Sequence, residues 1–282
     1  MSHTIGPAAP SRTPAGGMLV GGALTYRDGR LFVEDCDAGE LAAGFGTPLH
    51  VVSEARLRAN VRDFIERFSA AWPEGPVGVL ASIKANYSLA LRRILTQEGA
   101  GCDTFGLSEL RAALSAGVPP GSISVNGTAK PARLIHAAVG VGAPITLDNA
   151  AELALVERAA RELGRVAAVR VRLRPDYAAL TQASEFFPDE SIGAAATQYK
   201  PGVPAGDDIA LVRRALQTDG VVLAGCHAHI GRHSGALDMW RGMLRAYVAR
   251  IAAVRDATGW EPACTIEQTL ADMLESRRAA IR

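Results

Sequence analysis

The stretch VLASIKAN, from Val79 to Asn86, is a run of small and apolar residues that ends abruptly on a cation, Lys84. Such a run predicts a buried strand, and a lysine at its end places an amine at the rim of a hydrophobic sheet. Burial lowers the pKa of an amine, and the neutral form attacks carbonyl groups to form an imine. The same residues also fit a lysine whose apolar stem packs at a strand end while its charge stays in water.

Short apolar runs recur along the chain, and helical patterns such as Ser108–Ala116 and Asn149–Leu163 separate most of them. Strands that alternate with helices are typical of a parallel sheet with right-handed crossovers. No nucleotide-binding glycine fingerprint follows the first strand, so the pattern favours an α/β fold of the (β/α)8 TIM-barrel type over a doubly wound sheet. The runs that predict strands are Val77–Ile83, Cys102–Phe105, Ile123–Val125, Pro144–Leu147, Ala167–Leu173 and Val221–Ile230.

The 282 residues exceed the roughly 250 that such a barrel needs, which leaves room for flanking segments. Residues 1–17 are rich in Ala, Gly, Pro and Ser and lack the pattern of a signal peptide, so we expect a disordered tail there. Residues 18–48 predict a hairpin, with its turn at Asp28-Gly29, and a linker. We expect the barrel over residues 49–264, with a long loop at Ala178–Gly206, and a C-terminal helix over residues 265–282.

Charge and cysteine content narrow the class of partner. Thirty basic and twenty-nine acidic side chains give a net charge of +1 without a basic run, which argues against nucleic acid and anionic membrane as partners. The four cysteines lie far apart and predict a reduced, cytoplasmic protein rather than a disulfide scaffold. No segment carries the roughly 20 apolar residues of a membrane span.

Every predicted strand finishes on a polar or ionisable residue. In a parallel barrel the carboxyl ends of the strands meet at one mouth, so these residues are expected to form a ring around it. For Asn126 and Asp148, ordinary turn or cap chemistry explains the residue nearly as well. The strand ends are Lys84-Ala85-Asn86, Asp103-Thr104, Asn126-Gly127, Asp148-Asn149, Arg172-Leu173-Arg174 and His227-Ala228-His229.

His227 and His229 stand two residues apart, so in a strand their side chains point the same way. One interpretation is a metal pair, for which His233 is the only later histidine able to serve as a third ligand. A second is an imidazole stacked on a planar cofactor. A third is structural, with two packed histidines hydrogen-bonded at the barrel top.

The ordered set of motifs over roughly residues 20–262 resembles the barrel domain of the fold-type III pyridoxal-phosphate decarboxylases, which is the alanine racemase-like barrel. The resemblance is strongest to the enzymes that act on diaminopimelate, ornithine or arginine. Each motif is weak alone, and their order is specific to the superfamily. The motifs are Asp28-Gly29-Arg30-Leu31, Gly46-Thr47-Pro48-Leu49, Ile83-Lys84-Ala85-Asn86, Gly101-Cys102-Asp103 with Ser108-Glu109-Leu110, Asn126-Gly127 with Lys130, Asp148 with Glu152-Leu153, Arg172-Leu173-Arg174-Pro175 and Gly225–Gly231.

The resemblance implies a cofactor, pyridoxal 5'-phosphate, and a role for each matched residue. Lys84 would bond to the cofactor aldehyde, His229 would stack on the pyridine ring, and Asp103 and Arg172 would line the pocket. Gly231 and Arg232 complete the expected cofactor site. Arg232 stands where the family has a phosphate-binding serine, and its guanidinium suits phosphate as a bidentate partner. The reaction implied is decarboxylation of a basic or diamino acid, as in lysine biosynthesis, by a homodimer when full-length.

The sequence departs from the family pattern after Trp260-Glu261-Pro262, where no glycine follows Gly259 and the glycine-rich phosphate loop is missing. The last barrel strand and the C-terminal β domain, with its glutamate for the pyridinium nitrogen, also lack a counterpart. We therefore expect an incomplete barrel from a shortened chain, prone to aggregation or in need of a partner. Two other functions stay open: a non-catalytic binding or regulatory homologue, and a metal-dependent hydrolase using His227 and His229. The sequence does not name the substrate.

Overall fold

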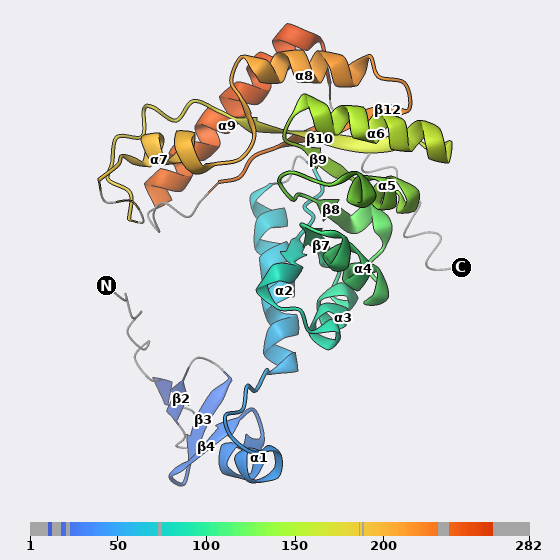
Figure 1. Cartoon of the computed structure of the whole chain (residues 1–282). Helices are drawn as coiled ribbons and strands as arrows, with labels where there is room; N and C mark the ends of the chain where they lie inside the picture. The colour runs from blue at the N-terminus through green and yellow to red at the C-terminus, as the bar shows by residue number, and fades with distance from the viewer. Residues whose placement is uncertain are drawn as a thin grey trace. The chain divides into compact units, whose positions relative to one another are not determined.

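The computed structural model describes residues 11–12, 18–20, 23–72, 75–185, 187, 189–230 and 237–261 (Figure 1). Contacts divide the chain into two compact units, Met1–Ala71 and Trp72–Arg282. The expected boundary between linker and barrel, at residues 48 and 49, lies upstream of this division. The segments expected to form the C-terminal helix, residues 265–282, lie outside the described residues.

The first unit contains a five-stranded antiparallel sheet and two helices, α1 (Ala38–Phe45) and α2 (Glu54–Ala71). The predicted hairpin is confirmed: Arg27 pairs with Arg30 across a turn in which Asp28 and Gly29 both have positive φ. The hairpin strands do not stand alone, because each has a second partner in the sheet. The strands are β1 (Ser11–Arg12), β2 (Met18–Val20), β3 (Leu24–Arg27), β4 (Arg30–Val33) and β5 (Cys36–Asp37).

Two expectations for this unit change. Ser11–Arg12 form a strand within the span expected to be a disordered tail, whose other residues lie outside the described part of the chain. The apolar run Leu49–Val52 in the sequence favours a short strand, and none forms there. Ser53 caps α2 by accepting a hydrogen bond from the backbone N–H of Arg56 at 3.0 Å.

The second unit is built on a parallel sheet in which every predicted strand appears, with ends that differ from the predicted ones by at most three residues. Neighbouring strands follow the chain order from β6 to β10, and β12 pairs with β10. A further short strand, β11, pairs with the last residues of β10. The strands are β6 (Leu80–Ser82), β7 (Gly101–Thr104), β8 (Ile123–Val125), β9 (Ile145–Leu147), β10 (Ala167–Arg174), β11 (Val203–Pro204) and β12 (Val221–His227).

Helices connect these strands and lie along the outside of the sheet (Figure 1). The helix predicted at Asn149–Leu163 is confirmed as α6, with Asn149 accepting from the N–H of Glu152 and Gly164 closing the helix in the left-handed conformation. The helices are α3 (Leu89–Gln97), α4 (Leu107–Ser115), α5 (Ala132–Val141), α6 (Ala150–Leu163), α7 (Ile192–Tyr199), α8 (Asp207–Leu216) and α9 (Leu237–Thr258), and short 3-10 turns occur at Ile83–Ala85 and Pro120–Ser122.

The long loop predicted at Ala178–Gly206 is wrong in part, because this region contains α7 and β11. The Ala-rich helix buries Ile192 and Ala196 against Met239 and Met243 of α9 in a small second core. Because α7 is short and its apolar residues show weak periodicity, the sequence pattern did not predict this helix.

The alternation of side chains along β10 explains how the sheet carries a site. Val169 and Val171 are fully buried in the main core, while Arg170 and Arg172 point to the opposite, inner face. The sheet has the architecture of a TIM-type barrel wall, and among the described strands no pairing joins β6 to β12 to close it. No helix within the described ranges is long and apolar enough to cross a membrane.

Candidate active site

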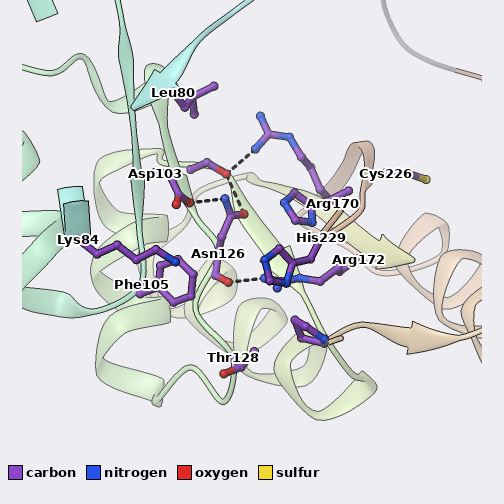
Figure 2. Close-up of a pocket in the computed structure, with 13 residues that line it drawn as sticks. Leu80, Lys84, Asp103, Phe105, Asn126, Thr128, Arg170, Arg172, Cys226 and His229 are labelled. Atoms are coloured by element: carbon purple, nitrogen blue, oxygen red, sulfur yellow. Dashed lines mark hydrogen bonds between the residues drawn. The ribbon is translucent and has the colours of Figure 1, made fainter. Parts of the chain in front are cut away.

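A cavity of about 630 Å³ lies at the inner face of the sheet, near the carboxyl ends of its strands. Its volume falls within the roughly 300–1,000 Å³ typical of small-molecule sites. Figure 2 shows Lys84 reaching in from the side of β6, and Arg170, Arg172 and His229 pointing in from the opposite wall. The complete lining is Leu80, Lys84, Asp103, Phe105, Ser124, Asn126, Thr128, Arg170, Arg172, Pro201, Cys226, His227 and His229.

Four residues expected at the site, Lys84, Asp103, Arg172 and His229, therefore lie on the wall of one cavity. The other two, Gly231 and Arg232, lie outside the described residues.

Lys84 differs from the expectation in its burial. It sits in the 3-10 turn that follows β6, its side chain is exposed, and its Nζ lies 4.2 Å from the centre of the Phe105 ring. The amine faces the open cavity because β6 ends before it, and the chain turns at Ile83. The expectation of a buried amine at this position is wrong, and its accessibility follows from the same geometry.

The chain contains three lysines, and only Lys84 offers an exposed side chain. Lys130 is 3% exposed and Lys200 is 5% exposed. The Nζ of Lys130 contacts Glu152 Oε2 at 2.8 Å, Asp148 Oδ2 at 3.3 Å and the Gly127 carbonyl at 2.6 Å. A reagent that attacks lysine amines therefore meets Lys84 in the cavity.

The wall opposite Lys84 is held by hydrogen bonds between neighbouring strands (Figure 2). The Asn126 amide nitrogen donates to Asp103 Oδ1 at 2.6 Å, and the Asn126 side-chain oxygen accepts from Ser124 Oγ at 3.0 Å and from the Thr146 hydroxyl. The carbonyl of Asn126 also accepts from the guanidinium of Arg172. Asn126 thus links β7, β8, β9 and β10 in one rigid polar surface.

Arg172 is buried and lies in a compact group of four charges. Its Nε is 3.2 Å from Asp148 Oδ1, and Asp148 and Glu152 both pair with Lys130. Burial raises the pKa of Asp148 and lowers that of Arg172, while the neighbouring opposite charges act against both shifts. Two cations and two anions balance, so the group is neutral as a whole.

His227 is uncharged at neutral pH. Burial, with smaller contributions from Arg172, His229 and Arg170, lowers the pKa of His227 to about 3. Its buried Nδ1 makes no hydrogen bond within the described part of the chain. Among the described residues no three of His, Cys, Asp or Glu gather as metal ligands, and His233 lies outside them.

Sequence reasoning missed Arg170, Ser124 and Phe105 as parts of the cavity wall. A signal for Arg170 was present, because a residue two before Arg172 in a strand shares its face. Ser124 has the same relation to Asn126. Phe105 carried no such signal, because its place under the Lys84 amine depends on how the turn after β6 approaches the end of β7.

Known proteins resemble this chain over most of its length. The family model for the pyridoxal-dependent decarboxylases, pyridoxal binding domain, matches residues 57–257. Diaminopimelate decarboxylase of Methanocaldococcus jannaschii is 35% identical over 214 residues, which cover 74% of this chain and 47% of that protein. Diaminopimelate decarboxylase of Archaeoglobus fulgidus is 32% identical over 204 residues, which cover 72% of this chain and 46% of the relative.

Solved structures are also similar to this chain. The crystal structure of the M. jannaschii diaminopimelate decarboxylase in complex with L-lysine matches with a TM-score of 0.78 and 26% identity, over 91% of this chain and 63% of that one. The chain spans about half the length of the relatives it matches in sequence. The matched residues include every strand that lines the cavity. This chain belongs to the pyridoxal-dependent decarboxylases and carries their pyridoxal binding domain.

Proposed function

We propose that this chain is the cofactor-binding part of a decarboxylase that acts on a diamino acid, with diaminopimelate as the substrate. The observation that carries the proposal is the single accessible lysine amine, Lys84, facing a cavity of suitable size in a pyridoxal binding domain. The substrate class is supported by the similarity to diaminopimelate decarboxylases, one of which was solved with L-lysine.

The donor set of the cavity fits pyridoxal phosphate. The exposed amine of Lys84 suits an aldehyde, the cation of Arg170 suits an anionic oxygen, and the neutral ring of His227 offers an unused polar atom. Lys84 would hold the cofactor covalently, His229 would face its ring, and Asp103 and Arg172 would border it. Gly231 and Arg232, outside the described residues, complete the set in this proposal.

Pyridoxal phosphate, when bound, supplies a ring that accepts the electron pair left at Cα as the carboxylate departs. The residues of the chain orient the bound molecule and enclose it. Asn126 fixes Asp103 and the guanidinium of Arg172, so these groups keep their positions without reorganising during the reaction. His227 is uncharged at neutral pH, because its pKa is about 3, so it does not act as a cationic acid and contributes a neutral imidazole surface.

The wider proposal is a cytoplasmic enzyme that works as a homodimer, with the barrel domain spanning residues 49–264. The family match beginning at residue 57 supports the inclusion of most of α2 in that domain.

The direct test is to incubate the full chain with pyridoxal phosphate, reduce it with borohydride and locate the modification by peptide mass spectrometry. We expect the label on Lys84 and its loss in Lys84→Ala. Lys200→Arg is the matched control and should label normally, because its side chain is buried. Labelling spread equally over Lys130 or Lys200, or none at Lys84, would contradict the proposal.

A second measurement addresses the substrate. Release of carbon dioxide from diaminopimelate, ornithine and arginine is compared using protein that has been incubated with pyridoxal phosphate and not reduced, and lysine should appear from diaminopimelate alone. Labelling at Lys84 without any turnover would instead favour the non-catalytic binding homologue.

A further inference from the structure

Arg170 is a charged residue of the cavity to which the sequence assigned no role. It lies in the middle of β10, two residues before Arg172, and both guanidinium groups face the cavity. Arg170 pairs in register with Thr146 of β9 and Gly225 of β12, so its position in the sheet is fixed by strands on both sides. In Figure 2 its side chain extends across the inner face of the sheet toward β8.

The two arginines differ in their charge balance. Arg172 pairs with Asp148, within a group that also holds Lys130 and Glu152 and carries no net charge. Arg170 donates from Nη1 to the hydroxyl of Ser124 at 2.9 Å, which is a neutral acceptor. No carboxylate of the described residues forms an ion pair with Arg170.

A guanidinium removed from water without a counterion is unfavourable. Burial lowers the pKa of Arg170, which nonetheless stays protonated because a guanidinium does not lose its proton in proteins. Arg170 and Arg172 contribute to the low pKa of His227, which lies on the neighbouring strand β12 in register with Arg172. An anion that enters the cavity would therefore gain both a charge partner and several N–H donors.

We propose that Arg170, oriented by Ser124, forms an oxyanion-binding subsite of this cavity, which takes the phosphate or carboxylate group of the molecule bound there. Both groups offer the paired oxygens that a guanidinium binds in a bidentate manner. The subsite itself does not depend on Lys84. The assignment of its oxyanion to the cofactor or to the amino acid does rest on the proposed function.

The first experiment measures the subsite alone, by calorimetric titration of the full chain with inorganic phosphate at low ionic strength. We expect saturable binding that Arg170→Gln weakens by roughly ten-fold or more, since a hydrogen-bonded charge pair is lost. The matched control is Arg174→Gln on the same strand, whose side chain donates to the carbonyl of Lys200 at 3.3 Å and does not line the cavity. It should bind phosphate within about two-fold of the unchanged chain.

The proposal is overturned if the unchanged chain shows no saturable phosphate binding, if Arg170→Gln binds as tightly, or if Arg174→Gln weakens binding equally. Arg170→Lys is a second variant that separates loss of the subsite from loss of folding. It keeps the positive charge and lacks the planar guanidinium group. It should retain a folded circular dichroism spectrum and fall between the unchanged chain and Arg170→Gln in affinity.

The second experiment distinguishes the two sources of the oxyanion. Borohydride labelling of Lys84 is measured against the concentration of pyridoxal phosphate and of pyridoxal, which lacks the phosphate. If the cofactor supplies the group, Arg170→Gln raises the half-saturating concentration of pyridoxal phosphate at least ten-fold and leaves that of pyridoxal within about two-fold.

If the amino acid supplies the group, Arg170→Gln leaves the half-saturating concentrations of both pyridoxal phosphate and pyridoxal within about two-fold of those of the unchanged chain. Binding of L-lysine then weakens at least ten-fold, while binding of L-lysinamide, which has no carboxylate, stays unchanged. An Arg170→Gln variant with none of these effects overturns the proposal. Failure of the unchanged chain to label at Lys84 contradicts the proposed function instead, and the titration with inorganic phosphate still decides the role of Arg170.

Discussion

Lys130 is the most connected charge near the cavity, because its amine contacts two carboxylates and one carbonyl while its side chain is fully buried. Through Asp148 it also balances Arg172. The backbone N–H of Lys130 donates to the same Glu152 carboxylate at 3.0 Å. This residue therefore joins the loop after β8 to the start of α6. Loss of its amine would leave the carboxylates of Asp148 and Glu152 with Arg172 as the remaining cation of the group.

Lys130→Met should lower the free energy of unfolding by about 3–5 kcal/mol, because it breaks a buried ion pair from one side. The measurement is urea denaturation followed by circular dichroism. The control is Arg241→Ala, which removes an exposed pair with Asp238 and should cost less than about 1 kcal/mol. Equal losses in the two variants would show that the buried group contributes no more than a surface pair.

His227 makes the stability of the fold depend on pH. Its pKa is about 3 in the folded protein and near its ordinary value of 6.5 in the unfolded chain, so the unfolded chain binds more protons between these values. The stability contributed by neutral His227 is full above about pH 6.5 and declines as the pH falls toward 3.

Between pH 7.5 and pH 5.5 the unchanged chain should lose about 1 kcal/mol more unfolding free energy than His227→Asn, which has no titrating ring. Urea denaturation at the two pH values measures both losses. Parallel losses in the two proteins would contradict the low pKa of His227.

Two helices are joined to the strands that precede them by the same kind of hydrogen bond, from a backbone N–H to a glutamate carboxylate. Glu109 in the first turn of α4 accepts from the N–H of Phe105 at 2.7 Å, and Glu152 in the first turn of α6 accepts from the N–H of Asp148 at 2.8 Å. In both cases the glutamate follows its donor by four residues. This hydrogen bond satisfies a backbone N–H at the mouth of the sheet and sets where each helix begins.

The loop after β8 passes close to the end of β7. A Cβ built at Gly127 would lie 2.2 Å from the carbonyl oxygen of Phe105, whereas one at Gly106 would meet nothing within 4 Å. Gly127→Ala should therefore displace the loop that carries Asn126 and lower the free energy of unfolding by about 2–3 kcal/mol.

Gly106→Ala is the matched control, because Gly106 precedes α4 in an extended conformation that alanine adopts. It should lower the free energy of unfolding by less than about 1 kcal/mol, because alanine is a poorer N-cap than glycine. Thermal unfolding of both variants measures the difference, and an unfolding midpoint for Gly127→Ala equal to that of the control would contradict the close approach.

At the scale of the whole molecule, α9 presents an apolar stripe. Trp240, Leu244 and Val248 recur at a spacing of four and are 39%, 47% and 62% exposed. Next to the sheet, Val222 of β12 is also exposed, and β12 pairs with β10 on one side. Exposed apolar side chains on a helix face and on a strand favour association with other apolar surfaces.

We expect the chain to self-associate at micromolar concentration, and Leu244→Glu with Val248→Glu to shift it toward the monomer. Sedimentation velocity over a range of concentrations measures the shift. Ala249→Glu, at an exposed position beside the stripe, adds a carboxylate without removing apolar area and should leave the association unchanged. Identical sedimentation of the double variant and the unchanged chain would show that the stripe plays no part.

The parallel sheet and the candidate residues Lys84, Asp103, Arg172 and His229 could be predicted from the amino-acid sequence. It could do so because strand and helix periods are local, and because the carboxyl ends of parallel strands meet at one edge whatever the details of packing. The cap of α6 and the hairpin turn were equally local, since each depends on residues within a few positions.

Three features became known from the folded chain alone: Lys84 is exposed, α7 and β11 occupy the region expected to be a loop, and Arg170 has no carboxylate partner among the described residues. The physical reason is that exposure and charge balance are set by neighbours distant in the sequence. Asp148, 24 positions from Arg172 and 18 from Lys130, pairs with both, while Arg170 donates to the hydroxyl of Ser124 across 46 positions.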